Sequence, residues 1–187
     1  MRALVLTLSA LLVTGGGPRT TTSVAPPTVV LLVRHAEKGT QPPQDPPLTA
    51  AGEERARALV AVARDAGVSA IITTQFERTR KTAEPTAVAL HVTPEVVTAG
   101  PAAQHAKAVA DQVLKHAGGT VLVVGHSNTL PAIVGALGAP QPRDLCDSEY
   151  DQLFVVIIGD AGPPRLIRSR YGAANVEDAA CAAMQPR

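Results

Sequence analysis

Aromatic residues are nearly absent from this chain of 187 residues, which has no tryptophan, two tyrosines and two phenylalanines. Proteins that bind single-stranded nucleic acid stack the bases on aromatic side chains, and an aromatic content of 2% argues against such a platform. An excess of charge of one sign is also lacking, since the formal net charge is +1 and no basic run stands out. Binding to a phosphate backbone requires a concentrated positive surface, and we therefore expect no nucleic-acid partner.

A long apolar run is missing as well, because the first one, at residues 3–13, is too short to cross a bilayer comfortably. It follows Met1-Arg2 and precedes three glycines and a Thr/Ser/Pro stretch that reaches Pro27. This order is typical of a secretory signal peptide, so residues 1–27 are predicted to be a signal peptide and linker of a secreted or periplasmic protein. An uncleaved N-terminal membrane anchor is the alternative. After removal of the signal we expect no stable membrane span.

Cysteine is scarce, with Cys146 and Cys181 as its two occurrences. In an exported chain an even pair is more often bridged than free, so we predict a disulfide between the loop at residues 144–150 and the C-terminal tail. On the chain-entropy view, a loop of this length stabilises the fold by about 3–4 kcal/mol. Two independent buried thiols are the alternative.

From Thr28 onward, apolar strand patterns alternate with helical stripes. Strands are predicted at residues 29–33, 70–73, 92–97, 120–124, 153–158 and 165–170, and helices at residues 49–66, 78–90, 106–117 and 131–137. Pro85 is expected to kink or divide the second helix, and Pro94 to keep the third strand near a sheet edge. The last two strands should pair antiparallel, because the connector between them is too short for a crossover.

This alternation predicts an α/β fold, a three-layer α/β/α sandwich with a mostly parallel central sheet and an antiparallel edge. The roughly 160 residues after the signal suffice for one domain and are too few for two. We place this domain at residues 28–171 and a tail, tethered by the predicted disulfide, at residues 172–187.

Two histidines each follow an apolar strand directly. Residues 29–33 lead into Arg34-His35, and residues 121–124 lead into Gly125-His126. Ligands of open parallel sheets bind at the carboxyl ends of the strands, so neighbouring strands would bring two imidazoles and a guanidinium into one crevice. A histidine in such a crevice can attack a phosphoryl group while cations offset its negative charge.

A third cation occupies the same kind of position, because Arg78 follows the strand at residues 70–73 and opens a helix. The segment at residues 125–129 also leads into a helix, whose free N–H groups favour an anion. Ser127 does not form a nucleophile elbow, since Thr129 stands where that motif needs its second glycine.

These residues resemble the motifs of the histidine phosphatase superfamily, which has the phosphoglycerate mutase-like fold. Arg34-His35-Ala36 resembles its Arg-His-Gly/Ala signature, and Gly125-His126-Ser127 resembles its second-histidine motif. Residues 74–82 resemble its Ser/Thr-x-x-x-Arg-Ala/Thr-x-x-Thr segment, and residues 47–52 its Leu-Thr-x-x-Gly helix start. The four motifs occur in the family's order along the predicted domain.

The resemblance implies a phosphoric monoester hydrolase of the histidine acid phosphatase type, with no metal and no other cofactor. His35 would attack phosphorus with one ring nitrogen while a backbone carbonyl holds the other, and water would then release the phosphate. Arg34, Arg78 and His126 would bind the phosphoryl oxygens, as guanidinium groups match phosphate geometry.

The proton donor departs from the family's pattern. Larger members use a carboxylic acid from a segment after the second strand–helix unit, and that segment is short here. Glu95 is its candidate, with a solvated edge residue as the alternative, and Asp147, Glu149 and Asp151 are rivals. Compact phosphohistidine-protein phosphatases of the superfamily work without a clear acid, because their leaving group needs less help.

Other polar residues near the motifs can be explained either by a functional role or by a structural one. Lys38, Ser127 and Asn128 are further candidates for substrate contact, although loop exposure explains Lys38 and helix capping explains Asn128 equally well. The remaining histidines are expected at the surface: His91, His105 and His116.

The sequence therefore predicts a metal-independent phosphatase that acts on a small phosphorylated substrate through a phosphohistidine. A phosphohistidine-protein phosphatase is one alternative, and a non-catalytic module that binds phosphate or a phosphoester is another. A mutase is disfavoured because no second cluster of arginines accompanies the motifs. The sequence specifies neither the substrate nor the oligomeric state.

Overall fold

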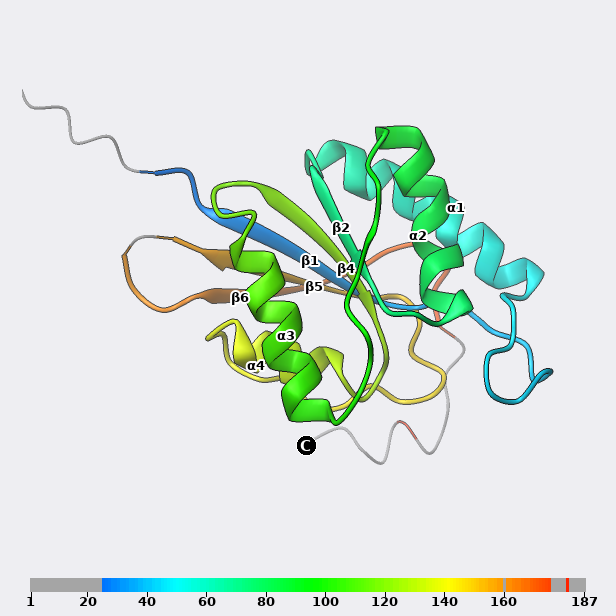
Figure 1. Cartoon of the computed structure of the whole chain (residues 1–187). Helices are drawn as coiled ribbons and strands as arrows, with labels where there is room; N and C mark the ends of the chain where they lie inside the picture. Colours follow the sequence, from blue (N-terminus) through cyan, green and yellow to red (C-terminus); the bar gives the residue numbers. More distant parts are fainter. Residues whose placement is uncertain (1–24, 160, 176–180, 182–187) are drawn as a thin grey trace, which may run out of the picture.

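The computed structural model describes residues 25–159, 161–175 and 181, which form a six-stranded sheet between helices (Figure 1). The strands are β1 (Thr28–Arg34), β2 (Ala70–Thr73), β3 (Glu95–Val96), β4 (Thr120–Gly125), β5 (Gln152–Ile158) and β6 (Arg165–Arg170). The helices are α1 (Ala50–Asp65), α2 (Glu77–Leu90), α3 (Ala102–Leu114) and α4 (Leu130–Ala136). The predicted elements are thus all present, with shifted ends.

The strand order in the sheet is β3-β2-β4-β1-β5-β6. Strands β3, β2, β4 and β1 run parallel to one another, whereas β5 runs antiparallel to both β1 and β6. The prediction of a mostly parallel sheet with an antiparallel edge is confirmed. Because β1 and β4 are direct neighbours with Arg34 opposite Gly125, the residues that follow the two strands begin side by side.

Two apolar clusters on opposite faces of the sheet give the domain its three layers. On β1, Val30 and Leu32 pack with α3 and α4, whereas Leu31 and Val33 pack with α1 and α2. Figure 1 shows the same division, with α1 and α2 on one side of the sheet and α3 and α4 on the other. Burial of both faces explains why the strand is an uninterrupted apolar run.

A local signal sets the start of α1, whereas a proline inside α2 does not end that helix. Thr49 is the N-cap of α1, and its side chain accepts a hydrogen bond from the Gly52 N–H at 3.2 Å. Pro85 was expected to kink or divide the second helix. It does not divide the helix, because α2 continues through it. Pro85 leaves the carbonyl of Lys81 without its helical partner, but Lys81 lies on the exposed side, where water can bind that oxygen.

The predicted disulfide is present between Cys146 and Cys181. It ties the tail to the loop that precedes β5. No helix in the described ranges is long and apolar enough to cross a membrane. The predicted signal segment, up to residue 24, lies outside the described residues.

Candidate active site

The two histidines that follow β1 and β4 meet at the carboxyl edge of the sheet. The ring centroids of His35 and His126 are 5.5 Å apart. Both side chains are buried, with His35 3% and His126 8% exposed. The juxtaposition expected from neighbouring parallel strands is therefore confirmed.

His35 is held in one tautomer by the backbone. Its Nδ1 lies 2.8 Å from the carbonyl oxygen of Ala36, and a carbonyl can only accept a hydrogen bond, so Nδ1 carries the proton. The lone pair is therefore on Nε2. Burial lowers the pKa of His35 to about 3, with the nearby charges of Arg34 and His126 acting in the same direction and the Ala36 hydrogen bond opposing them. Near neutral pH the ring is an uncharged nucleophile.

His126 is oriented by a chain of hydroxyl groups. Its Nε2 lies 3.1 Å from the Thr74 Oγ1, which in turn lies 2.9 Å from the Thr79 Oγ1. The ring of Phe76 packs edge-on against the imidazole, with centroids 5.4 Å apart. Burial, followed by the charge of Arg78, lowers the pKa of His126 to about 4. The second imidazole is thus also uncharged at neutral pH before an anion binds.

Arg34 has a double role that its sequence position did not reveal. Its Nη1 donates to the carbonyl oxygens of Cys146 and Asp147, both at 2.9 Å, and its guanidinium carbon lies 4.1 Å from the centroid of the Tyr150 ring. The Nε of Arg34 is buried and has no hydrogen-bond partner among the described residues. One edge of the guanidinium therefore holds the loop after α4, while another donor is left for a ligand.

Arg78 is positioned by a residue that sequence reasoning missed. Asp45, in the proline-rich loop after β1, lies 3.3 Å from the Nη1 of Arg78. Both carboxylate oxygens of Asp45 also accept the Glu77 N–H, at 3.0 and 2.9 Å, and so cap α2. The guanidinium of Arg78 stacks on Phe76, 4.2 Å from the ring centroid. A cap supplied from a distant loop leaves no signal within the helix sequence itself.

These side chains open onto a cavity of about 320 Å³. The predicted residues Lys38, Ser127 and Asn128 line it together with both histidines and both arginines. Asn128 is not a helix cap, and Thr129 is the N-cap residue of α4 without a capping side-chain bond. Instead the Thr129 Oγ1 accepts the N–H of His126 at 3.3 Å, so it holds the loop that carries the histidine.

The structure does not bring Glu95 to this cavity. Its carboxylate is hydrogen-bonded to Gln112 and lies 2.8 Å from the Nε2 of His116, near the C-terminal end of α3. In β3, Glu95 pairs with Ile72, whose side chain belongs to the cluster on the α3 side of the sheet. The loop before α3 contributes Gly100 to the cavity, so the far end of that helix lies away from it. The expectation that Glu95 donates the proton finds no support in this placement.

Of the three rival acids, only Asp147 lines the cavity. Its side chain is 100% exposed and lies 3.6 Å from the Nη2 of Arg34. Glu149 and Asp151 are buried, and they pair with Arg143 and Arg170 respectively, both at 2.8 Å. These two carboxylates thus anchor the loop rather than face the catalytic cavity.

The expectation that His105 lies at the surface is wrong. It is buried at the start of α3, and its Nδ1 lies 3.2 Å from the carbonyl oxygen of Thr98. Burial lowers its pKa. His105 stands four residues before Val109 and eight before Val113, so it shares the apolar stripe. That spacing was a usable signal for its burial.

One group of potential metal ligands lies together in the described ranges: Cys146, Glu149 and Cys181. The two sulfurs are joined to each other, and thiolates are the form that binds metal. The Glu149 carboxylate is already bound by Arg143 and by the Cys146 N–H. This group is therefore the anchor of a loop, not a site built for a metal ion.

The comparisons with known proteins point to one family. Residues 30–100 match the model of the histidine phosphatase superfamily, branch 1. This match includes Arg34, His35 and Arg78, and the second histidine lies beyond it. A search of curated proteins finds no match.

Solved structures share the fold at low sequence identity. A protein of Nakamurella multipartitia assigned as the phosphohistidine phosphatase SixA is 23% identical, with 81% of this chain and 100% of that chain covered and a TM-score of 0.57. A mycobacterial glucosyl-3-phosphoglycerate phosphatase is 15% identical, with 78% and 99% covered and a TM-score of 0.57. The protein histidine phosphatase SixA complexed with tungstate is 15% identical, with 76% and 96% covered and a TM-score of 0.58.

Proposed function

We propose that this chain, whose residues 30–100 match the model of the histidine phosphatase superfamily, hydrolyses phosphomonoesters through a phosphohistidine formed on His35. The observation that carries the proposal is the hydrogen bond from the His35 Nδ1 to the Ala36 carbonyl. It leaves the lone pair of Nε2 free at the cavity, where a phosphoryl group would be attacked.

The reaction proceeds in two displacements. In the first, the Nε2 lone pair of His35 forms a bond to phosphorus while the bond from phosphorus to the ester oxygen breaks, and the leaving oxygen takes a proton. In the second, water attacks the phosphohistidine, the N–P bond breaks, and phosphate departs as Nε2 recovers its lone pair. The proposed route needs no metal ion, because the protein supplies both nucleophile and cations.

Two guanidinium groups and the second imidazole bind the transferred group. Arg78 keeps donors at the cavity beside its contact with Asp45, and the Nε atoms of Arg34 and Arg78 have no partner among the described residues. Burial and then the charge of Arg78 lower the pKa of His126, and the negative charge of an incoming phosphate would act in the opposite direction, so we expect this imidazole to become protonated and to donate a hydrogen bond to the phosphoryl oxygens.

The proton for the leaving oxygen has one carboxylate candidate at the cavity, Asp147. Its side chain is fully exposed and lies 3.6 Å from the Arg34 Nη2, so its contact in the structure is with a cation and no group holds it against the leaving oxygen. We therefore propose that the enzyme depends on leaving groups that depart without strong protonation. Aryl phosphates should be hydrolysed much faster than alkyl phosphates of similar size.

The same observation supports a second candidate function, the hydrolysis of phosphohistidine in proteins. An imidazole leaving group needs little help from an acid, and two of the similar structures carry the name of such phosphatases. A phosphohistidine peptide hydrolysed with a much higher kcat/KM than any phosphomonoester would favour this candidate.

The test is hydrolysis of an aryl phosphate in the presence of a chelator by the wild-type protein and by His35→Ala. His116→Ala is the matched control, because His116 contacts Glu95 away from the cavity. We expect activity in the wild type and the control and none in His35→Ala. Activity that persists in His35→Ala would exclude His35 as the nucleophile. A wild type that binds vanadate without turnover would instead indicate a phosphate-binding module.

We also propose that the protein works in an oxidising compartment, as a secreted or periplasmic enzyme. The disulfide between Cys146 and Cys181 supports this, because such bonds persist mainly outside the reducing cytosol. The mass of the protein recovered from its native source would test the proposal. Loss of a segment that ends near residue 27 is expected, and an intact N-terminus would contradict a cleaved signal.

A further inference from the structure

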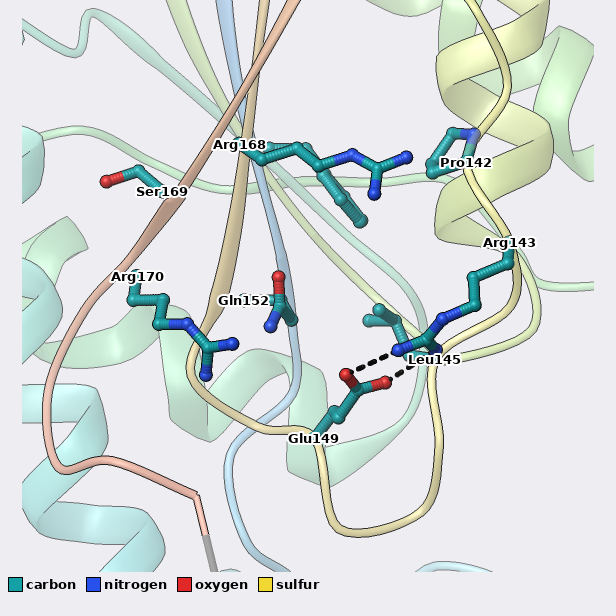
Figure 2. A pocket seen from close by; sticks show the side chains of 9 residues that line it. Pro142, Arg143, Leu145, Glu149, Gln152, Arg168, Ser169 and Arg170 are labelled. Carbon is teal, nitrogen blue, oxygen red and sulfur yellow. Dashed lines mark hydrogen bonds and ion pairs between the residues drawn. The ribbon is translucent and has the colours of Figure 1, made fainter. Parts of the chain in front are cut away.

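A second cavity, also of about 320 Å³, lies between the β5–β6 edge and the segment at residues 142–149 (Figure 2). Three arginines line it: Arg143, Arg168 and Arg170. Sequence reasoning found no second cluster of arginines, because these three come from a loop and an edge strand that are distant in the chain. The cluster therefore exists only in the folded protein.

The register of the sheet directs two of these arginines, both exposed at the sheet edge, to the same face. Arg168 pairs with Phe154, and Arg170 pairs with Gln152. Phe154 is 2% exposed and belongs to the core on the α3 and α4 side. Side chains alternate between the faces of a strand, so Arg168 and Arg170 lie on that side and Arg165 lies on the other. A charge that serves only to prevent edge pairing needs no particular face.

The charges in the second cavity do not balance. Arg143 is paired with Glu149 through two contacts of 2.8 Å, marked by dashed lines in Figure 2. Arg170 lies 2.8 Å from Asp151. Arg168 makes no hydrogen bond or ion pair within the described ranges. One guanidinium is thus left to attract an anion, with two more beside it.

Hydrogen-bond donors and one buried aromatic ring line the same cavity. Figure 2 shows the side-chain amide of Gln152 between Arg168 and Arg170, with Arg143 on the opposite side. The buried ring of Phe154 forms part of the lining. Planar guanidinium groups bind carboxylate and phosphate oxygens in pairs.

We propose that this second cavity binds a small polyanion, a molecule that carries at least two phosphate or carboxylate groups. The basic groups come from two segments, Arg143 from the loop and Arg168 and Arg170 from β6, so we expect the ligand to offer a charged group to each. The site is separate from the catalytic cavity, since the segment from Arg143 to Glu149 lies between them. The same segment offers the carbonyl oxygens of Cys146 and Asp147 to Arg34. The proposal does not depend on catalysis by His35.

Calorimetric titration with imidodiphosphate, which has two phosphoryl groups and resists hydrolysis, tests the proposal. Arg78→Gln weakens binding at the catalytic cavity, so the titration is carried out on this variant and on the wild type. Adding Arg168→Gln should lower the affinity of the remaining site at least about tenfold, the effect of losing a charged hydrogen bond. Arg165→Gln is the matched control, with the same charge on the same strand and the opposite face.

Three results would overturn the proposal. Arg78→Gln would show no saturable binding at millimolar imidodiphosphate or citrate, or its binding would be unchanged by Arg168→Gln. Alternatively, Arg165→Gln would weaken binding as much as Arg168→Gln does, which would indicate general charge attraction. Hydrolysis of an aryl phosphate, measured on the Arg168→Gln single variant, should equal that of the wild type. Because binding and turnover are measured separately, failure of the proposed phosphatase activity would leave the test of this cavity intact.

Discussion

The two arginine-lined cavities on either side of the segment at residues 142–149 have the same volume and different chemistry. Each measures about 320 Å³. The catalytic cavity holds two buried imidazoles whose pKa values are lowered to about 3 and about 4, whereas the other is lined by three arginines and one buried carboxylate, with no histidine. Guanidinium groups and space are enough to bind an anion. Reaction also requires a nucleophile with a free lone pair.

Removal of that nucleophile should abolish the chemical difference between the two cavities. His35→Ala should lower kcat for an aryl phosphate at least about 1000-fold, as loss of a catalytic nucleophile does in other hydrolases. Vanadate should still bind through the arginines. Steady-state kinetics and a vanadate titration check both points, and an activity loss of less than tenfold would contradict the assignment.

Removing a charge from the catalytic cavity should have the next largest effect. Arg78→Gln deletes a preorganised cation at the phosphoryl group, and we expect kcat/KM to fall about 100-fold. Arg80→Gln is the matched control, because Arg80 lies on the exposed side of the same helix. An equal loss in both variants would show that the effect is general to the charge of α2.

Removal of the disulfide should destabilise the segment at residues 142–149, which lies between the two cavities. Cys146→Ser combined with Cys181→Ser should lower the free energy of unfolding by about 3–4 kcal/mol. Two carbonyl oxygens of this loop accept hydrogen bonds from the Arg34 Nη1. Because a less ordered loop would hold Arg34 less firmly, the KM for an aryl phosphate should also rise. Denaturant unfolding and kinetics measure the two effects, and an unchanged KM would mean that the loop holds Arg34 without the disulfide.

The lowered pKa values of the histidines predict how stability depends on pH. Between pH 6.5 and about pH 3 the unfolded chain binds a proton at His35 that the folded protein does not, so the free energy of unfolding falls as the pH falls through this window. Each such histidine contributes a slope of about 1.4 kcal/mol per pH unit within it. His35→Gln should remove one such slope in denaturant unfolding at pH 6 and pH 4. Curves that differ by a constant amount would contradict the low pKa.

The smallest effect is expected at Asp147. Asp147→Asn should change kcat/KM for an aryl phosphate less than about threefold, because an aryl leaving group needs little help from a general acid. Asp144→Asn, an exposed change in the same loop, is the control. A loss of about 100-fold for alkyl phosphates in Asp147→Asn alone would identify Asp147 as the proton donor.

The parts of the site that were predictable are those that depend on strand order. The uninterrupted apolar run from Val29 to Val33 predicted a strand buried on both faces. The polar residues after it, including His35, were therefore expected at the end of the strand. The same reasoning placed His126, and the pairing of β1 with β4 brought the two rings together. The helix start at residues 47–52 was likewise recognisable, because the capping threonine, Thr49, stands within it.

The sequence did not reveal side-chain partners that are distant along the chain. Glu95 was a candidate acid by elimination, but its partners, Gln112 and His116, are supplied by α3. Asp45 gave no local sign that it would cap α2 and contact Arg78. Contacts across such separations are decided by how helices pack on the sheet.

By itself, the sequence determined the order of strands and helices, the positions of both histidines and the pair of cysteines that could be joined. These follow from local rules, namely the alternation of side chains along strands, the periodicity of helices and the capping of their ends. Only the tertiary structure decided that Arg34 holds the Cys146 loop and that Arg143 and Arg168 share a second cavity. Such groupings depend on register and packing between distant segments, because a one-residue shift of β6 would turn Arg168 to the opposite face.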